Sequence, residues 1–264
     1  MYQAIICDLD GTLLNSQHTI SKYTQEVIKA VKEKDMLICI ATGRHHPDAL
    51  AYQQMLGLDS YLITCNGAKI HDEKDREIFS GNMPADIAHD LIHTVVDSEI
   101  IRHVFQDEVW YCDQPGEIVT EAYKDSGVIP IDRPFHLIMG DITRVCFEYR
   151  RIPNKLFQLE ETLIDRFGDQ LNICFSSSIF LEVFRKGVSK GAAIQEILRQ
   201  KGIDMNQTIA FGDSLNDYDM LKTVGKGILM GNSNLSLRHS LPGCEVIDTN
   251  DNDGLARYLE HLFL

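Results

Sequence analysis

The most constraining feature of the sequence is an apolar run that ends in two aspartates. Ala4 to Cys7 is uninterrupted apolar sequence, which predicts a buried β-strand, and Asp8-Leu9-Asp10-Gly11-Thr12 follows it directly. Gly11 lets the backbone turn there, and open α/β sheets place their chemistry at the carboxyl ends of strands. Because side chains two residues apart on a strand point to the same side, we expect Asp8 and Asp10 to serve one reaction centre.

Composition limits the class of protein. The 264 residues are 44% hydrophobic, which is enough for one large or two small globular domains. Asp and Glu total 39 against 25 Lys and Arg, and the net charge of −14 argues against nucleic acids and anionic membranes as main partners. No apolar run approaches the roughly 20 residues that span a bilayer, and no leader pattern opens the chain, so we expect a cytoplasmic protein. The oligomeric state stays unknown.

Strand and helix patterns alternate at both ends of the chain. Apolar strands are expected at 36–41 and 61–64, with helices from about 22 and 47, and each strand ends in a polar turn that contains glycine. The same alternation returns near 186, with a helix at 190–200 capped by Ser189, strands at 208–211, 227–230 and 246–248, and a closing helix from 253. This rhythm predicts a doubly wound parallel sheet.

The middle of the chain has a different rhythm. Helices are expected at 85–96 and 154–167, a helical or irregular stretch near 118–124, and strands at 101–105, 109–112, 144–149, 171–175 and 180–184. Adjacent strands with hairpin-like spacing favour an antiparallel sheet with helices on one face. We therefore predict an α/β fold with a doubly wound parallel-sheet core, formed by residues 1–81 and 186–264, into which an α+β domain of residues 82–185 is inserted.

Four polar segments carry the candidate chemistry. They contain the carboxylates Asp8 and Asp10, the pair Thr42-Gly43, the helix-start Lys190, and Asp213 with Asp217. Clustered carboxylates do not all stay ionised without a cation, and oxygen-only ligands favour Mg²⁺. A lysine, a hydroxyl group and backbone amides beside a metal would cradle a phosphoryl group. The sequence has neither a Walker-type loop nor a GxGxxG motif, so a nucleotide or dinucleotide cofactor is not indicated.

These segments together resemble the haloacid dehalogenase superfamily, in its Cof-type branch of phosphatases with a large α+β cap of the C2B type. The motifs match in order: Asp8-Leu9-Asp10-Gly11-Thr12, Thr42-Gly43-Arg44, Lys190 and Gly212-Asp213-Ser214-Leu215-Asn216-Asp217, with Asn66-Gly67-Ala68 and Met230-Gly231-Asn232 also matching. The core is most similar to bacterial pyridoxal phosphate phosphatases that also accept sugar phosphates. The resemblance covers residues 1–80 and 186–264 and is weak over the cap, which would set substrate choice.

The resemblance implies a role for each matching residue. Asp8 would attack phosphorus and form an aspartyl-phosphate, and Asp10 would act as general acid and then as general base. Mg²⁺ would be held by Asp8, the Asp10 carbonyl and Asp213, with Asp217 as a ligand or a support. The residues expected to bind the phosphoryl group or the substrate are Thr42, Gly43, Arg44, Asn66, Lys190 and Asn216.

The expected function is a Mg²⁺-dependent phosphatase for a small phosphorylated metabolite, either pyridoxal 5′-phosphate or a sugar phosphate. A phosphotransferase or phosphomutase that uses the same aspartate is an alternative, as is a non-enzymatic phospho-aspartate or metabolite sensor. Asp10 argues against a sensor, because an acid/base group would shorten the life of the phosphorylated state. Two further readings stay open: Asn66 as a simple turn residue, and Arg44 as part of a solvated helix start.

Overall fold

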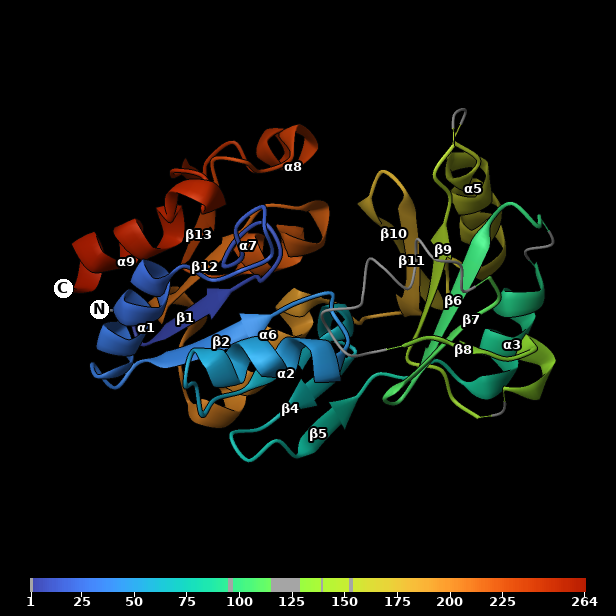
Figure 1. The fold of residues 1–264 in the computed structure, drawn as a ribbon, viewed down its shortest axis with the longest axis horizontal. Coiled ribbons are helices and arrows are strands. Elements are labelled where there is room, and N and C mark those ends of the chain that lie inside the picture. Colours follow the sequence, from blue (N-terminus) through green and yellow to red (C-terminus); the bar gives the residue numbers. More distant parts are fainter. Residues whose placement is uncertain (1, 95–96, 115–128, 139, 152–153) are drawn as a thin grey trace. The chain divides into compact units, whose positions relative to one another are not determined.

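The computed structural model describes residues 2–94, 97–114, 129–138, 140–151 and 154–264. The chain divides into two compact units (Figure 1). The first contains Met1–Arg44, Ala49–Phe79 and Ser189–Leu264, and the second contains His45–Asp48 and Ser80–Val188. The stretch near 118–124, for which a helical or irregular conformation was expected, lies outside the described residues.

The first unit is built on an eight-stranded sheet, counted over the described residues, in the order β14-β13-β12-β1-β2-β3-β4-β5. Its strands are β1 (Ala4–Cys7), β2 (Leu37–Ala41), β3 (Leu62–Thr64), β4 (Lys69–His71), β5 (Glu77–Ser80), β12 (Thr208–Gly212), β13 (Lys226–Leu229) and β14 (Glu245–Val246). The pairs from β14 to β3 are parallel, as the alternating rhythm predicts. The fold class is therefore confirmed, with one addition: β4 runs antiparallel to β3.

Two hydrophobic clusters cover the two faces of this sheet. Alternate residues of β1 point to opposite faces, so Ile5 and Cys7 belong to one cluster and Ala4 and Ile6 to the other. The first cluster joins the sheet to helices α1 (Lys22–Lys32), α2 (His46–Met55) and α9 (Gly254–Phe263). The second joins it to α6 (Lys190–Lys201), α7 (Tyr218–Thr223) and α8 (Leu235–Ser240). The unit is thus a three-layer α/β sandwich.

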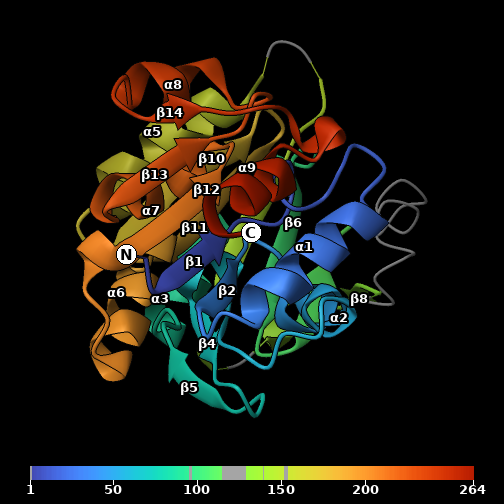
Figure 2. The same cartoon turned by 90° about the vertical axis from the view of Figure 1, so that its left-hand side faces the viewer.

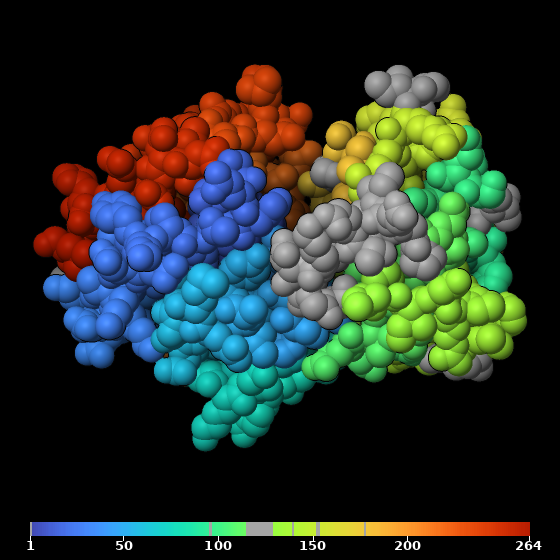
Figure 3. All heavy atoms as spheres, in the orientation of Figure 1, coloured from blue at the N-terminus to red at the C-terminus, as the bar shows by residue number. Residues whose placement is uncertain are grey.

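Helices α1 and α9 lie side by side on one face of the sheet, although they come from opposite ends of the sequence (Figures 2 and 3). The Ser21 side chain caps α1 by accepting a hydrogen bond from Thr24 N and also donates to Asp253 Oδ1 at 2.6 Å. Tyr23 OH donates to Glu260 Oε2 at 2.6 Å. The two ends of the chain thus complete one domain.

The second unit is an α+β domain. Its six described strands lie in the order β10-β11-β9-β6-β7-β8 and are β6 (Ile101–Gln106), β7 (Val109–Cys112), β8 (Ile131–Asp132), β9 (Arg144–Glu148), β10 (Leu171–Ser177) and β11 (Phe180–Arg185). All its pairs are antiparallel except that of β7 with β8. Helices α3 (Ala85–Thr94) and α5 (Leu156–Phe167) share one hydrophobic cluster with the strands. The sequence patterns missed the short strands β4, β5 and β8 and the short helix α8.

Candidate active site

The candidate site lies at the carboxyl ends of the central parallel strands of the first unit. Asp8 directly follows β1, Thr42 follows β2, and Asp213 follows β12. The registers align Cys7 with Ile40 on one side and with Phe211 on the other, and Asp8 N donates to Phe211 O at 3.0 Å. Parallel pairing therefore brings together polar segments that are more than 200 residues apart in the sequence.

Lys190 is the cation at the centre of the site. Its Nζ donates to Asp8 Oδ1 at 2.6 Å and to Asp217 Oδ1 at 2.7 Å, and its side chain is 0% exposed. Lys190 is the first residue of α6, and the Ser189 side chain caps this helix by accepting from Ala192 N at 3.1 Å. Gly67 lies against this helix start, where an added Cβ would be 2.2 Å from Ser189 O. The close backbone approach positions the ammonium group between the two carboxylates.

Burial and like charges shift the acids of the site toward their protonated forms. Burial, followed by the charge of Asp217, raises the pKa of Asp8 to about 7, against the opposing effect of Lys190. Burial and the charge of Asp8 raise the pKa of Asp213 to about 8. Burial opposes the charge of Lys190, but Asp217 and Asp8 outweigh it, so the pKa of Lys190 lies above its usual range. The single positive charge of Lys190 does not neutralise the carboxylates of Asp8, Asp213 and Asp217 when all three are ionised. A further positive charge would therefore stabilise their ionised forms.

Asp217 is fixed by hydrogen bonds to both of its oxygens. Oδ1 accepts from Lys190, and Oδ2 accepts from the backbone N–H groups of Asp213 at 2.9 Å and Ser214 at 3.0 Å. The residue is completely buried, and an added Cβ on Gly212 would lie 2.6 Å from its Cβ. Asp217 therefore holds the loop after β12 and orients Lys190, and of the two roles expected for it, this geometry favours support over direct metal ligation.

The residues fit a divalent cation. Carboxylate oxygens of Asp8, Asp213 and Asp217 lie within 4.8 Å of one another. Among the described residues, Asp213 Oδ1 is buried and has no hydrogen-bond partner, which a cation would provide. Gly11 has a positive φ of 77°, and an added Cβ would lie 2.5 Å from Asp213 Oδ2, so the backbone that carries Asp10 passes directly beside this carboxylate.

Hydrogen bonds join the loop that contains Thr42 to the turn that contains Asn66. Thr42 Oγ1 accepts from Arg44 N at 3.0 Å, and Asn66 N donates to Thr42 O at 3.0 Å. Asn66 lies in the short helix η1 (Cys65–Gly67) with a φ of 54°, and its Oδ1 accepts from Asn216 Nδ2 at 2.9 Å. An added Cβ on Gly43 would lie 3.1 Å from Asn66 Oδ1. Asn66 is therefore more than a turn residue, because it joins the Gly43 and Asn216 segments.

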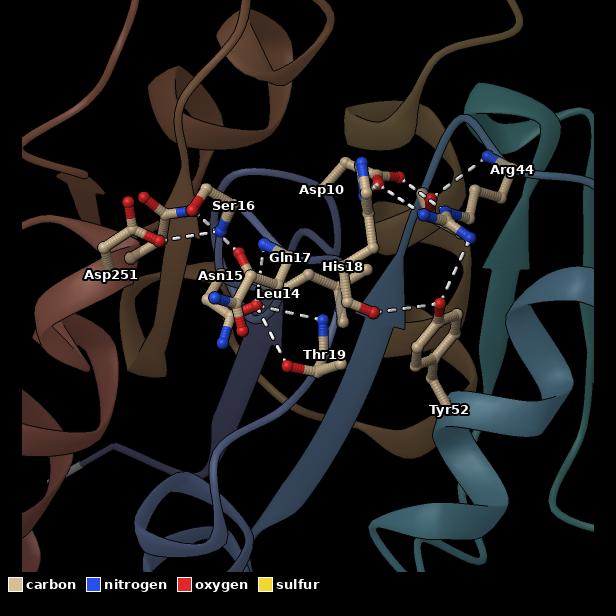
Figure 4. A network of polar contacts seen from close by, with 12 residues as sticks. Asp10, Leu14, Asn15, Ser16, Gln17, His18, Thr19, Arg44, Tyr52 and Asp251 are labelled. Carbon is tan, nitrogen blue, oxygen red and sulfur yellow. Dashed lines mark hydrogen bonds and ion pairs between the residues drawn. The ribbon is translucent and has the colours of Figure 1, made fainter. Parts of the chain in front are cut away.

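The Asp10 side chain is not among the carboxylates that contact Lys190. Its carboxylate accepts hydrogen bonds from Arg44 Nε at 2.7 Å and from Arg44 Nη2 at 2.6 Å, and its side chain is 44% exposed (Figure 4). Asp8 and Asp10, two residues apart, thus have different partners. Arg44, expected to bind substrate, is paired with the second aspartate.

Asn232 has a position that sequence reasoning left undefined. Its Nδ2 donates to Gly11 O at 2.8 Å, and its Oδ1 accepts from Asn250 N at 3.0 Å. Asn250 Nδ2 in turn donates to Leu14 O at 2.8 Å. Asn232 therefore joins the loop after β1 to the loop after β13. The signal available in the sequence was the Met230-Gly231-Asn232 motif.

Comparisons with known proteins agree with this geometry. Residues 5–259 match the family model of haloacid dehalogenase-like hydrolases. The chain is 35% identical to HMP-PP phosphatase of Serratia proteamaculans, over 99% of the chain and 95% of that protein, and 33% identical to a putative phosphatase of Haemophilus influenzae, over 99% and 97%. Among solved structures, a HAD subclass IIB sugar phosphatase matches with a TM-score of 0.82 and 25% identity, over 98% of both chains.

Within the described residues, no helix has the length and apolar character needed to cross a membrane. The family match spans nearly the whole chain, the relatives match almost end to end, and the site combines the four polar segments that the resemblance rests on. The chain therefore belongs to the haloacid dehalogenase-like hydrolases, in their Cof-type branch, and is a phosphatase that hydrolyses phosphoric monoesters.

Proposed function

We propose that this phosphatase is Mg²⁺-dependent and hydrolyses small phosphorylated metabolites through an aspartyl-phosphate on Asp8. The observation that carries the proposal is the buried contact of Lys190 with Asp8 and Asp217, beside Asp213. Asp8 is a carboxylate at a strand end, so it can attack phosphorus. The neighbouring Lys190 can neutralise the negative charge of the phosphoryl group that Asp8 attacks.

Asp8, Asp213 and the Asp10 carbonyl would hold Mg²⁺. The donor set is entirely oxygen, and the unpartnered Asp213 Oδ1 supports a cation at this place. When bound, the metal would supply positive charge that keeps Asp8 ionised and neutralises the phosphoryl oxygens. Asp217 would support the site without binding the metal, since its oxygens accept hydrogen bonds from Lys190 and two backbone N–H groups.

The chain's own residues divide the reaction into two steps. In the first, an Asp8 oxygen forms a bond to phosphorus while the bond from phosphorus to the leaving oxygen breaks, and Asp10 donates a proton to that oxygen. In the second, Asp10 takes a proton from water as the water oxygen attacks the aspartyl-phosphate, which releases inorganic phosphate and restores Asp8. The ammonium group of Lys190 would bind the transferring oxygens. Thr42 Oγ1 already accepts from Arg44 N, so its hydroxyl proton is directed elsewhere and can serve the same group.

The substrate belongs to the same proposal. Relatives named HMP-PP phosphatase and sugar phosphatase support phosphorylated small molecules as a class. HMP-PP therefore joins pyridoxal 5′-phosphate and the sugar phosphates as a candidate. We propose that the inserted unit of residues 82–185 acts as a cap that selects among them, so that exchanging cap residues would alter the substrate profile more than the rate on an aryl phosphate. A cytoplasmic location remains a prediction from the sequence.

The test is phosphate release with Mg²⁺ across a panel of phosphorylated metabolites, including HMP-PP, pyridoxal 5′-phosphate and several sugar phosphates. Selective release that is lost with EDTA and in Asp8→Asn would support the proposal. Asp59→Asn is a matched control, since the Asp59 side chain is 88% exposed and should leave activity unchanged. No release without an added acceptor hydroxyl would favour a phosphotransferase, and no turnover in a folded protein that binds Mg²⁺ would favour a sensor.

A further inference from the structure

Arg44 holds both carboxylate oxygens of Asp10. Its Nε lies 2.7 Å from Asp10 Oδ2 and its Nη2 lies 2.6 Å from Asp10 Oδ1, so the guanidinium donates to both oxygens of the carboxylate (Figure 4). Two parallel hydrogen bonds restrict the orientation of a carboxylate more than one does. Because the Asp10 side chain is 44% exposed, packing alone does not fix its rotamer. The Arg44 side chain supplies that restriction.

Tyr52 in turn positions Arg44. The Arg44 Cζ lies 5.1 Å from the centroid of the Tyr52 ring, and Nη1 lies 3.5 Å from the Tyr52 hydroxyl. Tyr52 OH also donates to the carbonyl of His18 at 3.3 Å, and its ring packs against the hydrophobic cluster that includes β1. Figure 4 shows the ring of Tyr52 below the guanidinium and the His18 carbonyl at its hydroxyl. Helix α2 thus supports the Arg44 side chain from the protein core.

A second group also faces Asp10. His18 Nδ1 lies 3.6 Å from Asp10 Oδ1, but the His18 side chain is 72% exposed. An exposed imidazole at this distance contributes little fixed geometry. The bidentate contact with Arg44, whose side chain is 18% exposed, is therefore the main determinant of where the Asp10 carboxylate lies.

We propose that Arg44 and Tyr52 are positioning residues for Asp10, and that Arg44 does not bind the transferring phosphoryl group. The inference rests on the proposed function, in which Asp10 is the general acid. When Asp10 transfers its proton to the leaving oxygen, the proton moves from one carboxyl oxygen while the other still accepts from Arg44. The carboxylate that results is then neutralised by the guanidinium. A lysine at this position would supply the positive charge but not the two hydrogen bonds in fixed geometry that Arg44 makes to the carboxylate.

The proposal separates two classes of substrate. An alkyl phosphate, such as the best sugar phosphate of the panel, needs a proton on its leaving oxygen, whereas p-nitrophenyl phosphate releases a stabilised phenolate. Because kcat/KM covers substrate binding and the steps up to departure of the leaving group, it excludes the later hydrolysis of the aspartyl-phosphate, and the comparison of the two substrates then reports on the general-acid step. A positioned general acid contributes roughly 10²–10⁴-fold, so we expect Arg44→Lys to lose at least about tenfold more kcat/KM on the alkyl phosphate than on p-nitrophenyl phosphate.

Tyr52→Leu should also lose more kcat/KM on the alkyl phosphate than on p-nitrophenyl phosphate, by a smaller factor than Arg44→Lys. Inorganic phosphate should inhibit both variants as it inhibits the wild type. Tyr52→Phe keeps the ring against the core and serves if the leucine variant fails to fold. The matched controls are Arg257→Lys, since exposed Arg257 donates to Asn252 O, and Tyr23→Phe, which removes an exposed tyrosine hydroxyl hydrogen bond. Both control variants should leave the ratio of kcat/KM on the alkyl phosphate to kcat/KM on p-nitrophenyl phosphate unchanged.

Two results would overturn the proposal. Equal losses on both substrates, together with weaker inhibition by inorganic phosphate, would make Arg44 a phosphoryl-binding residue. Unchanged kcat/KM on both substrates in folded Arg44→Lys would make the ion pair with Asp10 purely structural. Either result leaves the proposed function intact if Asp8→Asn is inactive, while an active Asp8→Asn would refute the proposed function itself.

Discussion

The acids of the site make the stability of the metal-free protein depend on pH in an unusual direction. Burial and like charges raise the pKa of Asp8 to about 7 and of Asp213 to about 8, from an ordinary value of 3.8. At these two acids the folded protein therefore binds more protons than the unfolded chain between pH 4 and about 8. Stability contributed by an acid of this kind is lost as the pH rises through that window.

The expected size of the effect follows from these values. One pKa unit corresponds to about 1.4 kcal/mol of free energy. Integrating between pH 6 and pH 8 gives a loss of between about 1 and 2 kcal/mol for Asp8 and about 2 kcal/mol for Asp213, so the metal-free protein should lose roughly 3–4 kcal/mol of unfolding free energy over this range. A cation binds the ionised carboxylates, so the stabilisation by Mg²⁺ should grow by a similar amount from pH 6 to pH 8.

Urea unfolding in EDTA and in saturating Mg²⁺, at pH 6, 7 and 8, measures this directly. Comparing the two conditions at each pH removes the contribution of groups outside the site. Asp213→Asn should flatten the metal-free pH dependence by about 2 kcal/mol, because it removes the larger of the two contributions. A Mg²⁺ effect on stability that is the same at pH 6 and pH 8 would contradict this expectation, because it would mean that metal binding does not compete with protons on these acids.

Three substitutions test the remaining geometry. Lys190→Met leaves the buried carboxylates of Asp8 and Asp217 without their cation and should cost about 3–5 kcal/mol in EDTA by urea unfolding, with loss of turnover; a smaller cost would mean that the carboxylates are neutralised otherwise. Asp217→Asn turns an amide donor toward Lys190 or toward backbone N–H groups and should cost about 1–3 kcal/mol, with unchanged stability as the contrary result. Gly11→Ala places a Cβ 2.5 Å from Asp213 Oδ2 and should weaken Mg²⁺ binding in a calorimetric titration, whereas wild-type affinity would show that the loop adapts.

Elements dominated by local sequence were predictable. Ala4–Cys7 is a strand with the expected bounds, and Ser189 caps the helix that begins at Lys190, because continuous apolar sequence and capping side chains act over a few residues. Parallel pairing then places the ends of these strands together. The fold class and the grouping of Asp8 with Lys190, Asp213 and Asp217 follow from that topology.

Pairings between distant side chains were not predictable. The contact of Arg44 with Asp10 depends on where helix α2 places Tyr52, and the contact of Asn232 with Gly11 depends on two loops that pack together. The short strands β4 and β5 were also missed, since runs of three and four residues carry little periodicity and Glu77–Ser80 is mostly exposed. Local pattern thus places the ends of the strands, and tertiary packing determines the partner of each side chain there.

In the proposed function, Asp8 becomes covalently phosphorylated during turnover. The most direct measurement is a rapid acid quench of the Mg²⁺-loaded enzyme with its best substrate, followed by borohydride reduction and peptide mass spectrometry. Borohydride reduces a phosphorylated aspartate to homoserine, so we expect homoserine at position 8 in the wild type. In Asp8→Asn we expect neither homoserine at this position nor turnover. Phosphate release without modification at position 8, or modification at another residue, would contradict the proposal.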